Sequence, residues 1–164
     1  IPIKKIYEGL KKFSGVKRRF SILNKSSKSM IIDDYAHHPS EIKTTLESLK
    51  KITRNKVVAI FEPHRYTRIN SLLKEFIESF SKADFVFILP IYSAGEKNIK
   101  KITNLHLEKI FKKKFKNNKI IKAVEKEQNL FKDLKDLYKD ENNIIVLGAG
   151  LSTNIAQKFS IYIE

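Results

Sequence analysis

The run Val57-Val58-Ala59-Ile60-Phe61 decides the fold class, because five apolar residues in succession leave neither side of a strand facing water. A second such run, Phe85-Val86-Phe87-Ile88-Leu89, follows it along the chain. The segment between them is expected to be helical over residues 69–81, with an apolar stripe formed by Leu72, Leu73, Phe76, Ile77 and Phe80. Apolar strands separated by amphipathic helices are typical of a mostly parallel sheet with helices on both faces. The sequence therefore predicts an α/β fold.

The same alternation extends over the rest of the chain. Helices are expected over residues 3–13, 39–52, 69–81, 104–115, 126–138 and 152–163, and strands over residues 18–23, 30–34, 56–61, 85–89, 119–124 and 143–147. A polar stretch joins the first two strands, which predicts a hairpin or a short connection. Ser14-Gly15 interrupts the pattern after the first helix, as glycine does at helix ends. We therefore expect a linker helix over residues 1–14 and one α/β domain over residues 15–164.

The composition predicts one folded domain with a basic surface. The chain has 164 residues, 41% of them hydrophobic, and a formal net charge of +15. A chain of this size typically forms one domain. Clustered cations favour nucleic-acid binding, but here the excess is mostly Lys, is scattered, and carries no aromatic stacking pattern. A basic nucleic-acid-binding module is therefore kept as an alternative, and no nucleic acid is expected as a partner.

The sequence predicts a cytoplasmic protein and a fragment of a longer one. Cysteine is absent, which is compatible with a reducing compartment. No window approaches the roughly 18 consecutive apolar residues of a membrane helix, so no membrane partner is expected. The chain opens with Ile1 and not Met, and its first apolar residues are spaced as in a helix entered midway. We expect that another part of the polypeptide precedes it.

The first cluster of polar residues is Asp33-Asp34-Tyr35-Ala36-His37-His38-Pro39, which runs from the end of an expected strand into a helix. Carboxylates, imidazoles and a phenol at this position can bind a metal, transfer protons or hold a nucleotide. They can equally be structural, with an aspartate capping a turn and Pro39 opening the helix. Adjacent histidines tend to point apart, which disfavours a metal site, and no metal is predicted here.

The second cluster, Glu62-Pro63-His64-Arg65-Tyr66-Thr67-Arg68, directly follows another expected strand. Arg65 and Arg68 lie three residues apart, so they share a face if a helix begins there, and both can reach one anion. Guanidinium groups bind carboxylates and phosphates in bidentate fashion. The alternative is a pair of surface arginines in a cationic chain. Because this chain uses Lys far more than Arg, an anion-binding pair is favoured.

Gly148-Ala149-Gly150 is similar to a dinucleotide-binding turn in its glycines, but it follows the last expected strand and not the first. The full glycine spacing is missing, and no ribose-binding acid follows it. We interpret it as a tight turn with close backbone approach and assign it no ligand. The chain also lacks a Walker A sequence, so it has no loop of that kind to cradle the phosphates of ATP.

Five motifs in this order resemble the last domain of the Mur ligase family over essentially the whole chain. They are Val16-Lys17-Arg18-Arg19-Phe20, Asp33-Asp34-Tyr35-Ala36-His37-His38-Pro39, Phe61-Glu62-Pro63-His64-Arg65-Tyr66-Thr67-Arg68, Tyr92-Ser93-Ala94-Gly95-Glu96 and Gly148-Ala149-Gly150. The resemblance implies a Rossmann-like domain that closes over the active site, after two domains that bind a UDP-sugar and ATP. The sequence departs from the family pattern at Leu151-Ser152-Thr153, where Asn-Ile is more usual.

Within the family, the Pro-His-Arg-Tyr-Thr-Arg segment resembles the branch that joins L-alanine to UDP-N-acetylmuramate in peptidoglycan synthesis. That branch uses ATP and Mg²⁺, held mainly by the domain with the P-loop, to phosphorylate the muramoyl carboxylate. The amine of L-alanine then attacks the acyl phosphate. A related ligase that recycles murein tripeptide shares the Asp-Asp-Tyr-Ala-His-His-Pro motif and is the alternative. The resemblance implies that this chain alone is inactive and holds no complete catalytic set.

The resemblance also implies roles for single residues. Arg19 resembles an arginine that reaches the ATP phosphates, and Asp34 an acid that binds the ribose hydroxyls. Tyr35 and His37 would line the nucleotide or the reaction centre. The group expected to meet the amino-acid carboxylate and the product consists of His64, Arg65 and Arg68.

Overall fold

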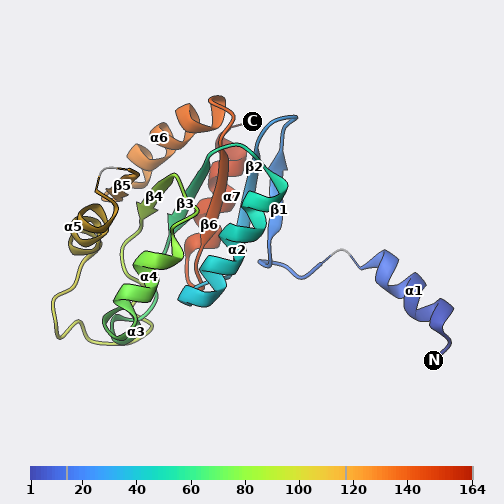
Figure 1. Ribbon diagram of the computed structural model, residues 1–164, viewed down its shortest axis with the longest axis horizontal. Helices are drawn as coiled ribbons and strands as arrows, with labels where there is room; N and C mark the ends of the chain where they lie inside the picture. The colour runs from blue at the N-terminus through green and yellow to red at the C-terminus, as the bar shows by residue number, and fades with distance from the viewer. Residues whose placement is uncertain (14, 117, 164) are drawn as a thin grey trace.

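The computed structural model describes residues 1–13, 15–116 and 118–163, and shows a six-stranded sheet with helices on both faces (Figure 1). The strands are β1 (Ser21–Lys25), β2 (Met30–Asp34), β3 (Val57–Phe61), β4 (Phe85–Ile88), β5 (Ile120–Ala123) and β6 (Asn143–Leu147). The helices are α1 (Ile3–Lys12), α2 (Pro39–Ile52), α3 (Tyr66–Ser71), α4 (Leu73–Ser79), α5 (Asn104–Phe115), α6 (Glu127–Lys139) and α7 (Ser152–Tyr162). The predicted α/β fold is confirmed.

The last strand of the chain lies in the middle of the sheet. The strand order is β1-β2-β6-β3-β4-β5, in which β1 is antiparallel to β2 and the other pairs are parallel. The predicted hairpin is thus confirmed. Leu147 on β6 pairs with Asp34 on one side and Phe61 on the other, and Phe61 also pairs with Ile88. These four strands therefore end at the same level.

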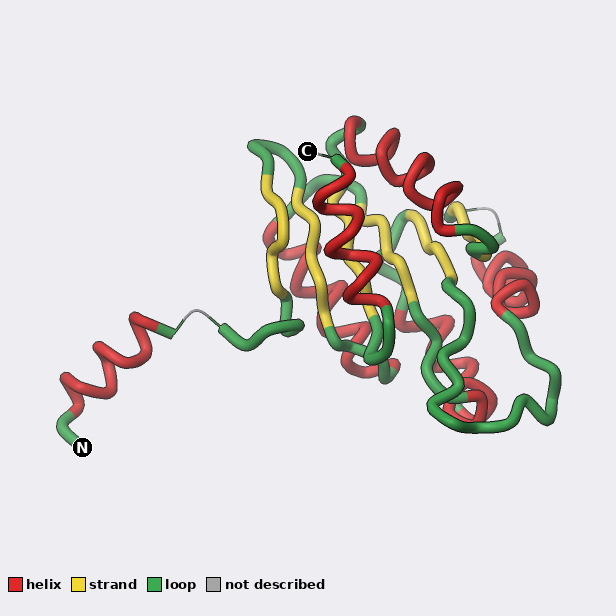
Figure 2. Tube along the Cα trace, turned by 180° about the vertical axis from the view of Figure 1, so that it is seen from behind, coloured by secondary structure: helices red, strands yellow, loops and turns green. Residues whose placement is uncertain are grey.

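Alternate side chains of each central strand enter two different cores. On β3, Val57, Ala59 and Phe61 face one core, which α2, α4 and α5 cover. Val58 and Ile60 face the other core, which α6 and α7 cover. Figures 1 and 2 show these two layers of helices from opposite sides of the sheet. With both faces buried, polar chemistry is confined to the edges and ends of the strands.

Two element starts differ by three residues from the sequence-based expectation, and other boundaries differ by one or two. The first strand begins at Ser21 and not at residue 18, because Arg18 and Phe20 have φ of 59° and 50°, which an extended strand does not accommodate. The helix expected over residues 69–81 begins at Tyr66 and divides at Leu72, which has φ −120° and ψ 26°. The apolar stripe belongs to α4, whereas α3 is mostly polar and gives no periodic signal.

α1 stands away from the sheet and packs on no other described element (Figure 1). Its apolar stripe is exposed, and Ile3 and Leu10 have 84% and 67% of their surface accessible. The helix itself confirms the expected segment, while its role as a linker stays a prediction. Ser14, at the end of that segment, lies outside the described residues. None of the helices in the described ranges is both long and apolar enough to cross a bilayer.

Replacing Phe80 by alanine should lower the free energy of unfolding by about 3–5 kcal/mol, because it leaves a cavity among packed rings. Phe80 is fully buried, with its ring centroid 5.0 Å from that of Phe61 and 5.7 Å from that of Phe111. Urea denaturation of the chain would measure the change. Ile99→Ala is the control, since Ile99 is 86% exposed and should alter stability by no more than about 0.5 kcal/mol. Equal effects of the two substitutions would contradict the described core.

Candidate functional site

The motifs singled out in the sequence meet at the carboxyl edge of the sheet. Asp34 ends β2, Glu62 follows β3, and Gly148 follows β6 at the same level. From there the chain turns toward α7 on one face after β6, and toward α2 and α3 on the other face after β2 and β3. Open α/β sheets bind ligands where neighbouring strands diverge in this way. The carboxyl edge is therefore the candidate site.

A row of aromatic rings crosses this edge and joins the segments that follow β2, β3 and β4. The ring centroids of Tyr35 and His37 are 5.2 Å apart, those of His37 and His64 5.4 Å, and those of His64 and Tyr92 5.0 Å. A backbone bridge between His64 and Tyr92 fixes the last pair. The row brings Tyr35 and His37, predicted to lie near the nucleotide, next to His64, predicted to lie near the amino acid.

The segment before β1 is attached to the same edge. The amide of Phe20 donates to Asp34 Oδ2 at 2.9 Å, and the amide of Tyr35 donates to the Arg18 carbonyl at 2.7 Å. Arg18 Nη2 donates to the Gly148 carbonyl at 2.8 Å. The sequence alone offered no reason to assign Arg18 a role beyond its place in a motif. In the structure its hydrogen bond to Gly148 ties the segment to the end of β6. This attachment carries its neighbour Arg19 to the rim.

Asp34 caps a turn of the backbone and also lines an open groove. Its Oδ1 accepts a hydrogen bond from the Ala36 amide at 2.7 Å, so the aspartate does cap a turn, as the structural alternative predicted. Burial raises the pKa of Asp34, although the Ala36 and Phe20 amides and nearby Arg19 act to lower it. A groove of about 560 Å³ passes beside it, lined by Arg19, Phe20, Asp34, Ala36, Ser40, Glu41, Thr44, Thr45 and Ser48.

Tyr35 does not line that groove, but its ring lies close to the guanidinium of Arg19, which does. The Arg19 guanidinium carbon lies 5.3 Å from the Tyr35 ring centroid, and that of Arg18 lies 4.8 Å from it. Neither Tyr35 nor His37 is among the residues that line the groove. The four residues predicted for nucleotide binding therefore form two neighbouring groups, Arg19 with Asp34 on the groove and Tyr35 with His37 in the ring row.

His37 is held by Glu41, which sequence reasoning did not assign. Glu41 Oε2 accepts from the amides of His37 and His38 at 3.0 and 3.1 Å and lies 3.3 Å from His37 Nδ1. Burial acts to raise the pKa of Glu41, but the His37 and His38 amides outweigh it and lower that pKa. The signal was present in the sequence, since an acid three residues into a helix is typical of a capping box. Glu41 thus orients the start of α2.

Arg65 immediately precedes α3 and Arg68 lies in its first turn, while their shared reach to one anion stays a prediction. Arg65 precedes the helix with φ 68° and ψ 127°, and its amide donates to the Tyr92 carbonyl at 2.8 Å. Arg68 Nη1 and His64 Nδ1 are buried atoms that have no hydrogen-bond partner in the described part of the chain. Buried polar atoms without partners are rare in folded proteins, so these two atoms keep capacity for a further hydrogen bond.

The Gly148–Gly150 turn is occupied by a side chain of the protein itself. Glu62, which is 4% exposed, accepts hydrogen bonds from the Gly150 and Leu151 amides, both at 2.8 Å. A Cβ atom on Gly148 would lie 2.7 Å from Glu62 Cβ, and one on Gly150 would lie 2.8 Å from Glu62 Oε2. The interpretation as a tight turn with close backbone approach is confirmed. Its amides serve a carboxylate of the chain.

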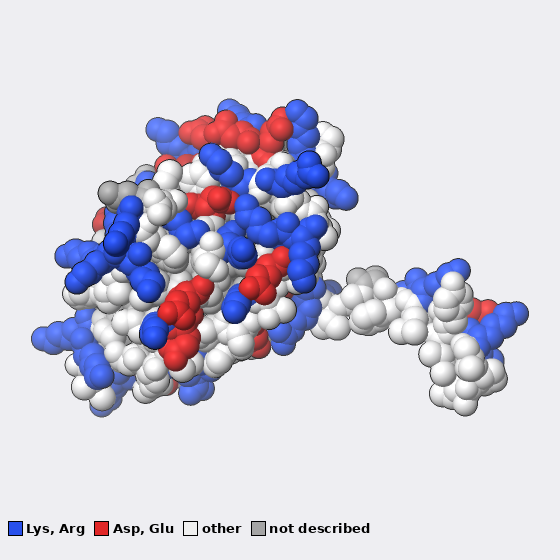
Figure 3. Space-filling model, viewed as in Figure 1, with Lys and Arg blue, Asp and Glu red and all other residues white. Residues whose placement is uncertain are grey.

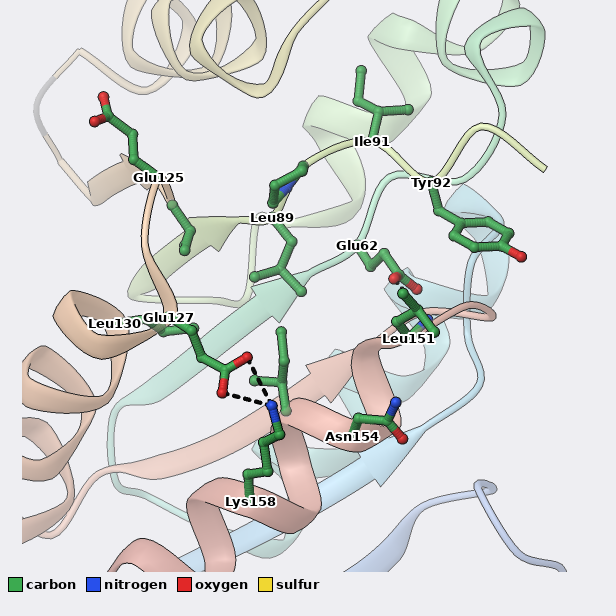
Figure 4. Close-up of a pocket in the computed structure, with 13 residues that line it drawn as sticks. Glu62, Leu89, Ile91, Tyr92, Glu125, Glu127, Leu130, Leu151, Asn154 and Lys158 are labelled. Carbon is green, nitrogen blue, oxygen red and sulfur yellow. Dashed lines mark hydrogen bonds and ion pairs between the residues drawn. The ribbon is translucent and has the colours of Figure 1, made fainter. Parts of the chain in front are cut away.

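A cavity of about 390 Å³ lies beside this turn, between α6, α7 and the segment after β4 (Figure 4). Its walls are mainly apolar, and three of its four charged side chains have partners within the chain. Glu62 caps the glycine turn, Glu127 pairs with Lys158 at 2.9 Å, and Glu125 directs its carboxylate away from the other labelled side chains. Of the residues predicted for the site, none lines this cavity. We therefore assign it no function.

Charge on the face that carries α2 and α4 is mixed. Figure 3 shows Lys and Arg in excess there, with Asp and Glu side chains interspersed among them. Among the described residues, no group of three or more His, Cys, Asp or Glu side chains is placed to hold a metal ion. The charged features with the most specific geometry are the arginines of the carboxyl edge.

A mostly parallel sheet with helices on both faces, and with polar side chains gathered at its carboxyl edge, defines a Rossmann-like domain. The chain matches the family described as Mur ligase, glutamate ligase domain, over residues 18–150. It belongs to the Mur ligase family. The resemblance indicated by the five motifs is thereby confirmed.

Curated relatives similar to this chain are named for one branch of the family. UDP-N-acetylmuramate–L-alanine ligase of Fusobacterium nucleatum is 39% identical over 97% of this chain, and that of Rickettsia felis is 40% identical over 95%. The crystal structure of UDP-N-acetylmuramate–alanine ligase from Thermotoga maritima aligns over 99% of the chain with a TM-score of 0.69 and 28% identity. The chain spans 35%, 33% and 33% of these proteins, about a third of each.

The pKa values of His37 and His64 should lie below 6.5 in the folded chain. Burial lowers both, and for His64 the neighbouring His37, Arg68 and Arg65 lower it further. Unfolded histidines take up protons near pH 6.5, so the free energy of unfolding should fall as the pH decreases below that value. A proton NMR titration of the imidazole resonances, assigned with His37→Gln and His64→Gln, would measure both values. A midpoint at or above 6.5 for either residue would contradict its burial.

Proposed function

We propose that this chain is the C-terminal domain of an ATP-dependent ligase that joins L-alanine to UDP-N-acetylmuramate in peptidoglycan synthesis. The observation that carries the proposal is the meeting of an Arg19–Asp34 groove and an Arg65–Arg68 pair at one edge of the sheet, connected by a row of rings. The relatives named for this reaction support it. Parts of the protein outside this chain would bind UDP-N-acetylmuramate and would contain the P-loop.

Arg19, Asp34, Tyr35 and His37 form the proposed nucleotide side. Asp34 is suited to ribose hydroxyls, because each carboxylate oxygen accepts one backbone amide and keeps a further lone pair. Arg19 lines the same groove and provides a positive charge for phosphate oxygens. ATP bound with Mg²⁺ would supply the phosphoryl group that activates the muramoyl carboxylate. This chain would contribute orientation and charge to that step and would be inactive alone.

His64, Arg65 and Arg68 form the proposed amino-acid side. The guanidinium groups of Arg65, just before α3, and of Arg68, in its first turn, can hold the α-carboxylate of L-alanine and direct its amine toward the reaction centre. The partnerless Arg68 Nη1 and His64 Nδ1 offer positions for ligand oxygens. Burial lowers the pKa of His64, which favours the neutral imidazole beside the incoming amine.

The exposed stripe of α1 supports the proposed linker over residues 1–14. Apolar residues spaced on one face of a helix stabilise it only when that face is covered. We propose that another part of the full-length protein covers it, and that the chain turns at Gly15, which has φ 92°.

We further propose that the protein is located in the cytoplasm. The proposed use of ATP and the absence of cysteine from this chain support this location.

The recycling ligase is the alternative within the family. The crystal structure of a murein peptide ligase from Psychrobacter arcticus has a TM-score of 0.73 but only 21% identity, so its likeness concerns the fold. Offering the full-length protein free L-alanine or the tripeptide separates the two: the proposed function requires turnover with L-alanine. The family assignment also favours a ligase over a nucleic-acid-binding module.

Arg65→Ala in the full-length protein should raise the KM for L-alanine by about 10- to 100-fold, since a hydrogen bond to a charged group contributes about 1.5–3 kcal/mol. The KM for ATP should change less than about twofold, because Arg65 lies on the amino-acid side of the ring row. Steady-state kinetics with each substrate varied in turn would measure both. Arg54→Ala, which removes an exposed arginine between α2 and β3, is the matched control. An unchanged KM for L-alanine would remove Arg65 from the site.

Arg19→Ala should have the opposite pattern. Its KM for ATP should rise about 10-fold or more, by the same cost of a lost charge-assisted contact, and its KM for L-alanine should stay nearly constant. Arg19→Lys keeps the charge but loses the planar fork, so an intermediate value is expected. If nucleotide affinity is equal in all three proteins, the groove beside Asp34 is not the nucleotide site.

A further inference from the structure

The first turn of α3 is capped by a residue from another loop. The position that normally carries a Ser, Thr, Asp or Asn cap is taken by Arg65, whose side chain can only donate hydrogen bonds. Glu96 fills this need. Its Oε2 accepts from the Thr67 amide at 3.0 Å, and its Oε1 accepts from the Thr67 hydroxyl at 2.7 Å. The capping carboxylate therefore comes from 29 residues further along the chain.

The loop that carries Glu96 is shaped to return to α3. Ala94 and Gly95 have φ of 50° and 85°, two successive left-handed residues that turn the chain sharply. The Glu96 amide donates to the Ser93 carbonyl at 3.1 Å and closes this turn. At the start of the same loop, the Tyr92 carbonyl accepts from the Arg65 amide at 2.8 Å. The segment from Tyr92 to Glu96 thus holds Arg65 by its backbone and the helix after it by its first turn.

Glu96 also meets the arginine side chain. Its Oε1 lies 3.7 Å from Arg65 Nη1, and 19% of the Glu96 side chain is exposed. The amide and hydroxyl of Thr67, followed by Arg65, lower the pKa of Glu96, so the carboxylate is charged at neutral pH. Arg65 and Arg68 together carry two positive charges against this single negative one. One positive charge is left over for an incoming carboxylate.

We propose that Glu96 is a positioning residue for Arg65, which holds the guanidinium and the start of α3 where the α-carboxylate of the amino-acid substrate binds. This inference rests on the proposed function and names a residue to which that function had given no role. Glu96 itself need not touch the substrate. Its carboxylate fixes the arginine by a hydrogen-bonded cap on one side and an ion pair on the other.

The two interactions can be separated by substitution in the full-length protein. Glu96→Ala removes both the cap and the ion pair, and should raise the KM for L-alanine at least 10-fold while leaving the KM for ATP and the KM for UDP-N-acetylmuramate within twofold. Glu96→Gln keeps an oxygen that can accept from Thr67 but loses the charge. It should recover most of the affinity, with a KM for L-alanine within about threefold of the parent. Glu78→Ala removes an exposed carboxylate from α4 and is the matched control.

Arg65→Ala, measured alongside, makes the outcomes distinguishable. If Arg65→Ala raises the KM for L-alanine and Glu96→Ala does not, the positioning role is wrong and the proposed function stands. If neither substitution changes it, the amino-acid side of the proposed function fails as well. A Glu96→Ala protein in which all three KM values rise together, with a lowered melting temperature, would show a general structural role and would also overturn the proposal. Selective loss with rescue by Gln supports it.

Discussion

The shared level at which four parallel strands end is the constraint on which the rest of the structure depends. β6 lies between β2 and β3, and its pairing places Asp34, Leu147 and Phe61 side by side. Because helices cover both faces, a charged side chain inside a central strand would lose its water without compensation. Polar residues therefore gather just past the strand ends. Segments that are far apart in sequence become neighbours there, so the pairing that builds the core also assembles the candidate site.

The carboxyl edge contains two kinds of charged residue. Some serve the chain itself: Glu62 holds the glycine turn, and Glu41 holds the start of α2. Others keep unused capacity, as Arg68 does with its buried Nη1 in the described structure. The satisfied carboxylates fix the backbone from which the arginines project. A rim built in this way is ordered before a ligand arrives, which lowers the entropy cost of binding.

The local sequence pattern predicted the buried strands and helices, but it did not predict the contacts that loops make. The unbroken apolar runs of β3, β4 and β6 and the amphipathic stripes of α2 and α4 identified the fold. The start of β1 was predicted three residues too early, because nothing in Arg18-Arg19-Phe20 signals two residues with positive φ. Motifs next to strand ends predicted a candidate site at the carboxyl edge, where the structure brings them together, and its binding role stays a prediction. The contact between Glu96 and Thr67 joins residues 29 positions apart and leaves no local trace. The ring row has the same origin, since it is produced by the sheet order.

The carboxylate seated in the glycine turn has a consequence for inhibitor design. Many dinucleotide-dependent enzymes place a pyrophosphate on a glycine-rich turn between a strand and a helix. In this chain Glu62 supplies the anion there, and neither glycine leaves room even for a methyl group. A compound that imitates a bound dinucleotide would meet negative charge and a filled niche. Selective chemistry against this fold has to start from the outer rim, where guanidinium groups project.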